Sequence, residues 1–138
     1  MDPKRILIAL VVTFIVIGAT DYLIHDIILR EAYAPGAGTI WRAEIPMSGI
    51  LISEFLLAIA YTLLWARIVL GGAALKCAIA LGVFMGLARA SYDVMHHAVQ
   101  PIPEGLLAKW IIFGFIQSLI IAVVLFFVHK PTKPCPGE

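Results

Sequence analysis

The sequence predicts an all-α integral membrane protein, a bundle of four membrane-spanning helices, and composition is the first reason. Hydrophobic residues make up 62% of the 138 residues, charged residues only 14%, and the mean hydropathy is +0.99. Soluble domains are about half apolar and about one quarter charged, and a chain this short could not bury so much apolar surface on its own. The net charge of +1 gives no sign of a nucleic-acid-binding surface, and two cysteines make no disulfide scaffold.

The second reason is the number of long apolar segments. A membrane-spanning helix needs roughly 20 predominantly apolar residues, and we expect spans at about 6–29, 46–70, 75–99 and 106–128. Pro46 suits the first turn of the second span. These spans define one transmembrane domain over residues 1–130. Residues 131–138 contain three prolines and are expected to be a flexible cytoplasmic tail.

The third reason is the distribution of basic and aromatic residues around the spans. Lys and Arg concentrate on the cytoplasmic side of membrane proteins, so both termini are predicted to be cytoplasmic in a bacterial inner membrane. Six basic residues fall on the terminal side and three on the other: Lys4, Arg5, Arg67, Lys76, Lys130 and Lys133 against Arg30, Arg42 and Lys109. Trp41 and Trp110 fit the outer interface and Trp65 the inner one.

The first loop, from Arg30 to Glu44, is long and would lie outside the membrane. We expect it to be an ordered outer cap, or to contain a short interfacial helix such as Ala37 to Ala43.

Function is suggested by the polar residues that fall inside the spans. An ionisable group in a span costs about 3 kcal/mol on insertion scales and is a functional candidate by default. With a rise of about 1.5 Å per residue, these groups lie at one level in the outer half of the bilayer. They are Asp21, His25, Asp26, Glu54, Arg89, Asp93, His96 and His97, with Gln117 as the polar residue of the fourth span.

Two spans carry the pattern Asp-x-x-x-His, which places both side chains on one helix face. Asp21 pairs with His25 in this way, and Asp93 with His97. The neighbours on or beside these faces are Arg89, His96, Tyr22 and Tyr92.

A metal site is one interpretation, because imidazole and carboxylate groups bind copper, zinc or iron. The candidate ligands are Asp21, His25, Glu54, Asp93 and His97. Four buried acids against one arginine leave an excess of negative charge, which calls for cations or protons. The spacing also resembles that of helix-borne copper ligands in membrane-bound methane and ammonia monooxygenases. Residues predicted to support the site or bind the ligand are Asp26, Arg89, His96, Tyr22, Tyr92, Gln117, Trp41 and Arg42, with the Trp41-Arg42 loop covering it.

Other interpretations stay open. His25 and His97 could be axial ligands of haem b, although several carboxylates at the same level fit haem less well. The cluster could handle protons or bind a small polar molecule. It could also be purely structural, with Arg89 paired to Asp93 or Glu54. In that case the protein would be a non-catalytic accessory subunit of a larger membrane complex. Whether the protein is an enzyme is left open.

Close helix packing is predicted by Gly82-x-x-x-Gly86, either within the bundle or in a homodimer.

The whole chain resembles a family of small uncharacterised bacterial membrane proteins with four spans. The residues that carry the resemblance are His25, Tyr33, Trp41-Arg42, Met47, Tyr61, Pro101-Ile102, Trp110 and Lys130-Pro131. The resemblance implies an inner-membrane location and a long first outer loop, and it implies no activity.

Overall fold

The fold is a bundle of long helices. The computed structural model describes residues 3–37, 39–42, 44–72 and 74–130, and these residues form helices and no strand. The first long helix is α1 continued without a break by the π-helix η1, and it is followed by α3, α4 and α5. The bounds are α1 Pro3–Asp21, η1 Tyr22–Ile28, α3 Met47–Leu70, α4 Leu75–Val99 and α5 Glu104–Val128.

Four helices, with α1 and η1 counted as one, are long and apolar enough to span a membrane. This confirms the predicted all-α membrane class. The predicted starts at 6, 46, 75 and 106 compare with the observed starts Pro3, Met47, Leu75 and Glu104. The predicted tail over 131–138 lies outside the described residues. Large apolar side chains are exposed on the long helices, as expected for helices that lipid surrounds.

The connection between the first two long helices holds two short elements, the helix α2 (Arg30–Tyr33) and the 3₁₀ turn η2 (Ala34–Gly36). The possible helix over 37–43 was a wrong expectation for the residues described there. The backbone instead turns back on itself, because the amides of Ile40 and Trp41 both donate to the carbonyl oxygen of Gly36 at 3.0 Å. This turn brings Trp41 close to Tyr33, whose ring centroid is 5.5 Å away.

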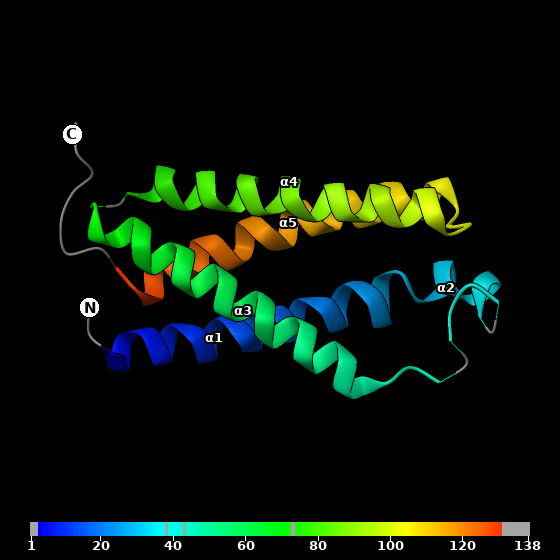
Figure 1. The fold of residues 1–138 in the computed structure, drawn as a ribbon, viewed down its shortest axis with the longest axis horizontal. Helices are drawn as coiled ribbons and strands as arrows, with labels where there is room; N and C mark the ends of the chain where they lie inside the picture. The colour runs from blue at the N-terminus through cyan, green and yellow to red at the C-terminus, as the bar shows by residue number, and fades with distance from the viewer. Residues whose placement is uncertain (1–2, 38, 43, 73, 131–138) are drawn as a thin grey trace.

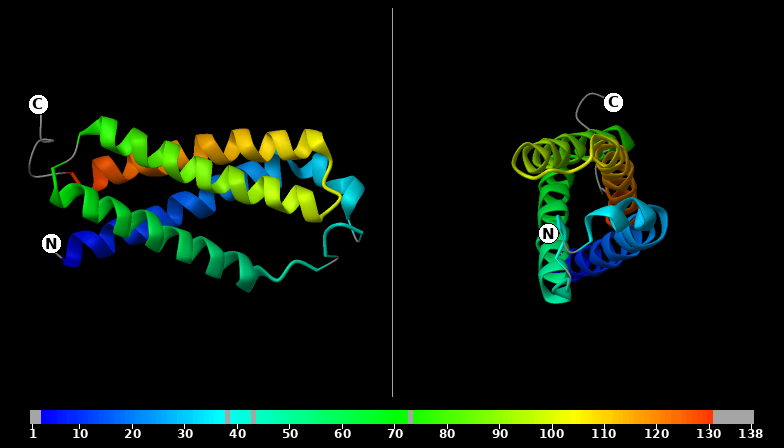
Figure 2. Two further views of the ribbon diagram at one scale, coloured as in Figure 1. Left: turned by 45° about the horizontal axis from the view of Figure 1, so that its top comes forward. Right: turned by 90° about the vertical axis from the view of Figure 1, so that its right-hand side faces the viewer.

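The long helices pack as unequal pairs. In Figure 1 α4 and α5 lie along each other where α4 ends and α5 begins, they diverge toward the end where α5 ends, and α3 crosses α1. The end-on view in Figure 2 shows the tilted long helices as the sides of a frame, and α3 and α4 share few contacts. The α4–α5 pair depends on Gly82, where an added Cβ would lie 2.9 Å from the Leu119 Cα. The predicted close approach at this glycine therefore occurs within the bundle.

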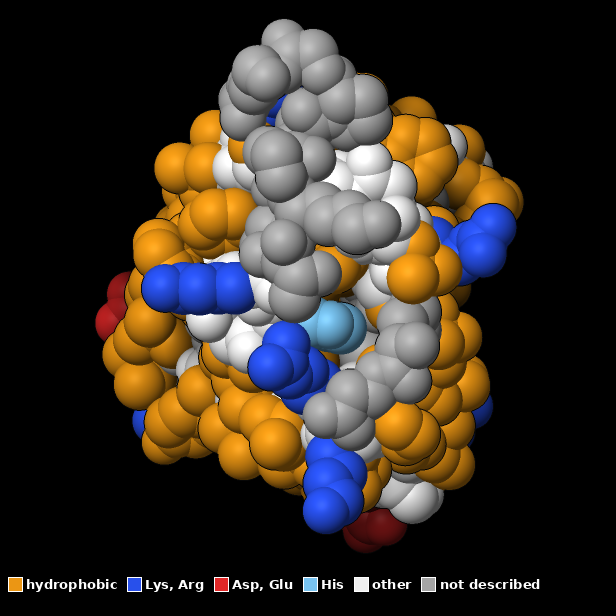
Figure 3. Space-filling view, turned by 90° about the vertical axis from the view of Figure 1, so that its left-hand side faces the viewer, with side chains coloured by type: hydrophobic (Ala, Val, Ile, Leu, Met, Phe, Trp, Pro, Cys, Tyr) orange, Lys and Arg blue, Asp and Glu red, His pale blue; other side chains and the backbone are white. Residues whose placement is uncertain are grey.

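The two ends of the bundle differ in charge. We call the end where α1 begins and α5 ends the terminal end, and the opposite one the α2 end. Figure 3 looks onto the terminal end, where Lys and Arg side chains gather and acidic ones lie only at the margin. The basic residues described at this end are Lys4, Arg5, Arg67 and Lys76, which lie in helices, and Lys130, which follows α5.

Apolar packing forms two separate cores. The larger one fills the terminal half and includes Ile17, Tyr61 and Ile121. Trp65 also belongs to it. It was expected at the membrane interface but is fully buried, and its indole donates to the carbonyl oxygen of His129 at 3.1 Å. The smaller core lies at the α2 end: Ile24, Leu29, Ile102 and Leu106. Along α1–η1 the residues between Ile17 and Ile24 include Thr20 and Asp21, so a polar layer separates the two cores.

The π-helix η1 begins directly after Asp21. Its wider turns hydrogen-bond from residue i+5 back to residue i, as the Leu29 amide does to the Ile24 carbonyl oxygen at 2.8 Å. Just before it, the Thr20 hydroxyl donates to the carbonyl oxygens of Val16 at 2.7 Å and Ile17 at 3.0 Å. Single π turns inside α-helices are frequent at functional sites, and this one carries His25 and Asp26.

Candidate functional site

Gln117 of α5 is the centre of the polar layer. Its side chain is completely buried, yet every polar atom of its amide has a partner. The Nε2 group donates to Asp21 Oδ1 at 2.8 Å and to Thr20 Oγ1 at 2.7 Å. The Oε1 atom accepts a hydrogen bond from Arg89 Nη1. One amide thus joins α1, α4 and α5, because its donor and acceptor ends face opposite charges.

Arg89 of α4 is the internal counter-charge, and its ion-pair partner is Asp21, with Nη2 3.7 Å from Oδ1. The hypothesis of a purely structural cluster predicted that Arg89 pairs with Asp93 or Glu54, and the ion pair with Asp21 differs from that prediction. Gly114 of α5 makes room for the long side chain, since an added Cβ there would lie 3.1 Å from the Arg89 Cδ. Glu54 and Asp93 form no ion pair with another described residue, although the charge of Arg89 also acts on Asp93.

A chain of polar groups runs from α2 to the polar layer. The Trp110 indole, which can only donate, donates to the Tyr33 hydroxyl at 2.6 Å. The Tyr33 oxygen lies 2.5 Å from His25 Nδ1, and His25 Nε2 lies 3.9 Å from Asp21 Oδ1. Burial raises the pKa of Tyr33 to about 12, so its hydroxyl keeps its proton at neutral pH. When His25 is neutral, these contacts are all favourable if the Tyr33 hydroxyl donates to His25 Nδ1 and the imidazole carries its proton on Nε2.

Two carboxyl groups remain unpaired. Glu54 of α3 is only 8% exposed and forms no hydrogen bond or ion pair within the part of the chain that the structure describes. The Oδ2 atom of Asp93 is buried and likewise without a hydrogen-bond partner. An unpaired buried polar group costs free energy, so a partner that hydrogen-bonded to either carboxyl would stabilise the fold.

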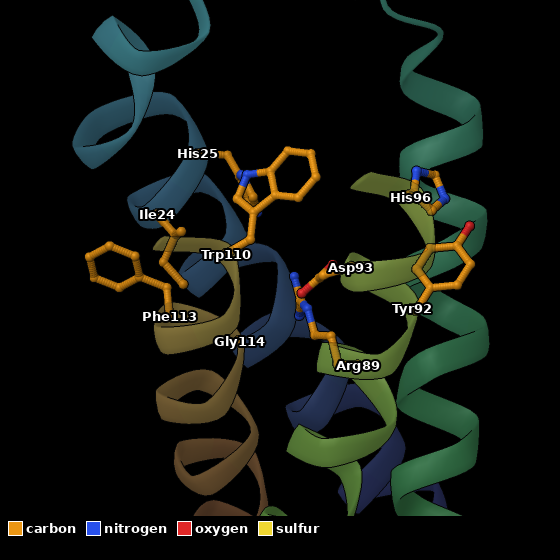
Figure 4. Close-up of a pocket in the computed structure, with 9 residues that line it drawn as sticks. All are labelled: Ile24, His25, Arg89, Tyr92, Asp93, His96, Trp110, Phe113 and Gly114. Carbon is orange, nitrogen blue, oxygen red and sulfur yellow. The ribbon is translucent and has the colours of Figure 1, made fainter. Parts of the chain in front are cut away.

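Cavities surround these groups. A cavity of about 390 Å³ between α3 and α4 is lined by Glu54, Asp93, Arg89, Asp21 and Tyr61. A second cavity of about 510 Å³ borders Glu54, Asp21 and His25 from the side of Met47 and Tyr22. A third cavity of about 230 Å³ lies among η1, α4 and α5. Figure 4 shows Arg89 and Asp93 pointing toward its middle, with His25 and Trp110 nearer the α2 end.

The other predicted residues lie around this centre. The rings of Tyr92 and His96 in α4 are in contact, with centroids 4.4 Å apart and planes tilted by 52°, and both residues line the third cavity. His97 borders none of the cavities described above, and its Nδ1 atom is buried without a hydrogen-bond partner. The structure therefore brings His25, and not His97, into the hydrogen-bonded chain. The remaining three, Asp26, Trp41 and Arg42, line a separate cavity at the α2 end.

A metal-ligand set does not form among the residues that the structure describes. No three His, Cys, Asp or Glu side chains there lie close enough together to hold a metal ion. Copper, zinc, iron and haem b stay predictions from the sequence.

Sequence reasoning did not assign a site role to Thr20 or Tyr33, and treated Trp110 only as an interface residue. Thr20 had one available signal, its position beside Asp21. The helix periodicity gave no signal for Tyr33. This residue lies eight positions after His25, in the separate short helix α2, so the spacing along one helix does not predict their contact.

The fold and these side chains define a class, a four-helix membrane protein with a polar layer and cavities toward one end. Comparisons with protein-family models, with curated proteins and with solved structures found no match for this chain. Its function is therefore inferred from the geometry of the polar layer.

Proposed function

We propose that this membrane protein binds a small polar ligand with a cationic group, such as an amine, in the cavities beside the polar layer. Glu54 carries the proposal, because it is 8% exposed and unpaired among the described residues, and it borders both the 390 Å³ and the 510 Å³ cavities.

The sign of the ligand's charge follows from the pairing of the neighbouring groups. Asp21 and Arg89 offset each other's charge at 3.7 Å. Glu54 and Asp93, which border the same cavity, form no ion pair with another described residue. An ammonium group between them could donate to both, as a buried carboxylate requires. The cavity volumes are in the range of small-molecule sites, about 300–1,000 Å³.

The site would face the outside of the cell. The basic residues at the terminal end favour a cytoplasmic location of that end by the positive-inside rule. The polar layer and its cavities would then open toward the periplasmic side of a bacterial inner membrane.

The test is ligand binding by the full chain, purified in detergent. Butylammonium is the probe for the amine, and Zn²⁺ and Cu²⁺ are separate probes for the metal. We expect butylammonium to raise the unfolding temperature of the wild type and to have no effect on Glu54→Gln. Glu31→Gln, an exposed carboxyl in α2, is the matched control and should respond like the wild type. Failure of butylammonium to act on the wild type, or an unchanged response in Glu54→Gln, overturns the proposal. Stoichiometric metal binding that Glu54→Gln abolishes would replace the amine with a metal ion.

Proton handling is a second candidate, which the Tyr33–His25–Asp21 chain favours. Histidine and carboxylate groups in a row can relay protons through a membrane protein. In liposomes loaded with a pH-sensitive dye, the wild type should collapse a pH gradient faster than His25→Gln does. Equal rates for the two proteins would remove this candidate.

A further inference from the structure

The largest cavity described lies outside the polar layer, at the α2 end. It has a volume of about 540 Å³ and lies between the α2 segment, the start of α3 and α5. Its lining combines the arginines Arg30 and Arg42, the aromatic rings of Tyr33, Trp41 and Trp110, and the apolar side chains of Ile45 and Ile50. These arginines and aromatic rings do not line the cavities of the proposed amine site.

The arginines make the cavity suitable for an anion. Neither Arg30 nor Arg42 forms an ion pair or side-chain hydrogen bond with another described residue. A guanidinium presents its donors in a fork that matches two phosphate oxygens. Asp26 is the one acidic side chain of this lining, so the cavity offers two positive charges and one negative charge.

The aromatic wall is held in place. The ring centroids of Tyr33 and Trp41 are 5.5 Å apart, those of Trp41 and Trp110 are 5.8 Å apart, and those of Tyr33 and Trp110 are 6.3 Å apart. Tyr33 is also fixed by its hydrogen bonds with Trp110 and His25. Such rings attract an ammonium group through their negatively polarised faces.

The apolar side of the cavity borders on lipid. Ile45 is 65% exposed and Ile50 is 37% exposed, just before and just within the first turn of α3. Arg30 lies directly after the first membrane-length helix, which ends at Ile28. In a membrane spanned by these helices, the charged groups would lie at the depth of the lipid head groups and the isoleucines beside the upper acyl chains.

We propose that this cavity binds the head group of a phospholipid that carries both a phosphate and an ammonium group. Arg30 and Arg42 hold the phosphate, and Asp26 and the aromatic wall hold the ammonium group. The first part of an acyl chain lies along Ile45 and Ile50. This site is separate from the proposed amine cavity, with which it shares only the bordering side chains of His25, Asp26, Ile45 and Ile50.

Binding is tested with the full chain in a lipid-free non-ionic detergent, by titration with dihexanoyl phosphatidylethanolamine. Fluorescence of the tryptophans is the readout, since Trp41 and Trp110 line the cavity and Trp65 is buried in the other half. Two comparison compounds test which part of the lipid the cavity recognises. Dihexanoylglycerol lacks the head group, and O-phosphorylethanolamine lacks the acyl chains. We expect saturable binding of the phospholipid and binding at least about tenfold weaker for both others. Equal binding of O-phosphorylethanolamine overturns the assignment to a lipid, and equal binding of dihexanoylglycerol overturns the head-group site.

Variants locate the site. The double variant Arg30→Gln/Arg42→Gln should weaken phospholipid binding about tenfold or more, because two charge-assisted contacts are lost. Arg67→Gln, at the terminal end, is the matched control and should bind like the wild type. Asp26→Asn should lose the preference for phosphatidylethanolamine over phosphatidylglycerol, which has no ammonium group. Glu54→Gln should leave phospholipid binding unchanged, which distinguishes this site from the amine cavity. Unchanged binding in the double variant refutes the proposal.

Discussion

Replacement of Gln117 by leucine is the sharpest test of the polar layer, because it removes the amide while nearly keeping the volume. The variant loses hydrogen bonds to Asp21, Thr20 and Arg89. Three hydrogen bonds at the membrane-protein average of about 0.6 kcal/mol give a loss of about 2 kcal/mol. With about 1.5 kcal/mol for each of the two bonds to charged groups and about 1 kcal/mol for the bond to Thr20, the loss is about 4 kcal/mol. The ion pair between Arg89 and Asp21 remains, and their side chains are 29% and 20% exposed, which argues against a larger loss. We therefore expect Gln117→Leu to lower the free energy of unfolding by about 2–4 kcal/mol.

The assay is equilibrium unfolding in mixed micelles with increasing amounts of dodecyl sulfate, followed by circular dichroism. Gln100→Leu is the matched control, because Gln100 is exposed at the end of α4. It should change the free energy of unfolding by less than about 0.5 kcal/mol, the usual range for surface substitutions. If Gln117→Leu also stays within that range, the hydrogen bonds of the polar layer do not stabilise the bundle, and a stabilising role for Gln117 is refuted.

Three further predictions use the same unfolding measurement. Asp21→Asn should lower stability by about 1–3 kcal/mol, since it leaves Arg89 without its ion-pair partner; a neutral result would show that Arg89 is satisfied without it. Gly82→Ala should destabilise the α4–α5 pair by about 1–3 kcal/mol. Gly105→Ala, where an added Cβ meets nothing within 4 Å, should be neutral or stabilising, and the reverse order would contradict the close approach. Because burial raises the pKa of Tyr33 from 10.0 to about 12, the Tyr33 contribution to stability should be constant below pH 10 and fall from pH 10 to 12. The difference in stability between the wild type and Tyr33→Phe measured over that range should therefore shrink, and a flat difference would contradict the buried hydroxyl.

The spans could be predicted because the bilayer imposes a length and a polarity on each of them. The second span, expected at 46–70, is the helix Met47–Leu70, and the third, expected at 75–99, is Leu75–Val99. Helix ends at this accuracy follow from where apolar residues stop and Gly, Pro or charged residues begin. No tertiary contact is needed for that reasoning.

The site could be predicted only in part, because composition identifies polar residues in a span but does not identify their partners. Asp21, Arg89 and Gln117 were all candidates, and the structure joins them. Their pairing depends on the crossing of α1, α4 and α5, which helix periodicity does not specify. His97 shows the limit of such reasoning: it shares a face with Asp93 by spacing, yet the hydrogen-bonded chain uses His25 through Tyr33.

The two halves of the bundle differ in how tightly they pack. The terminal half holds the larger apolar core and the close α4–α5 contact at Gly82. Toward the α2 end, the first long helix has the wider turns of the π-helix η1, and the cavities lie beside the polar layer. The helices α3 and α4 share few contacts. Cavities and unpaired carboxyls are destabilising on their own, so the tightly packed half must offset their cost. The position of Glu54, unpaired in the less tightly packed half, fits a group kept for a ligand better than one kept for packing.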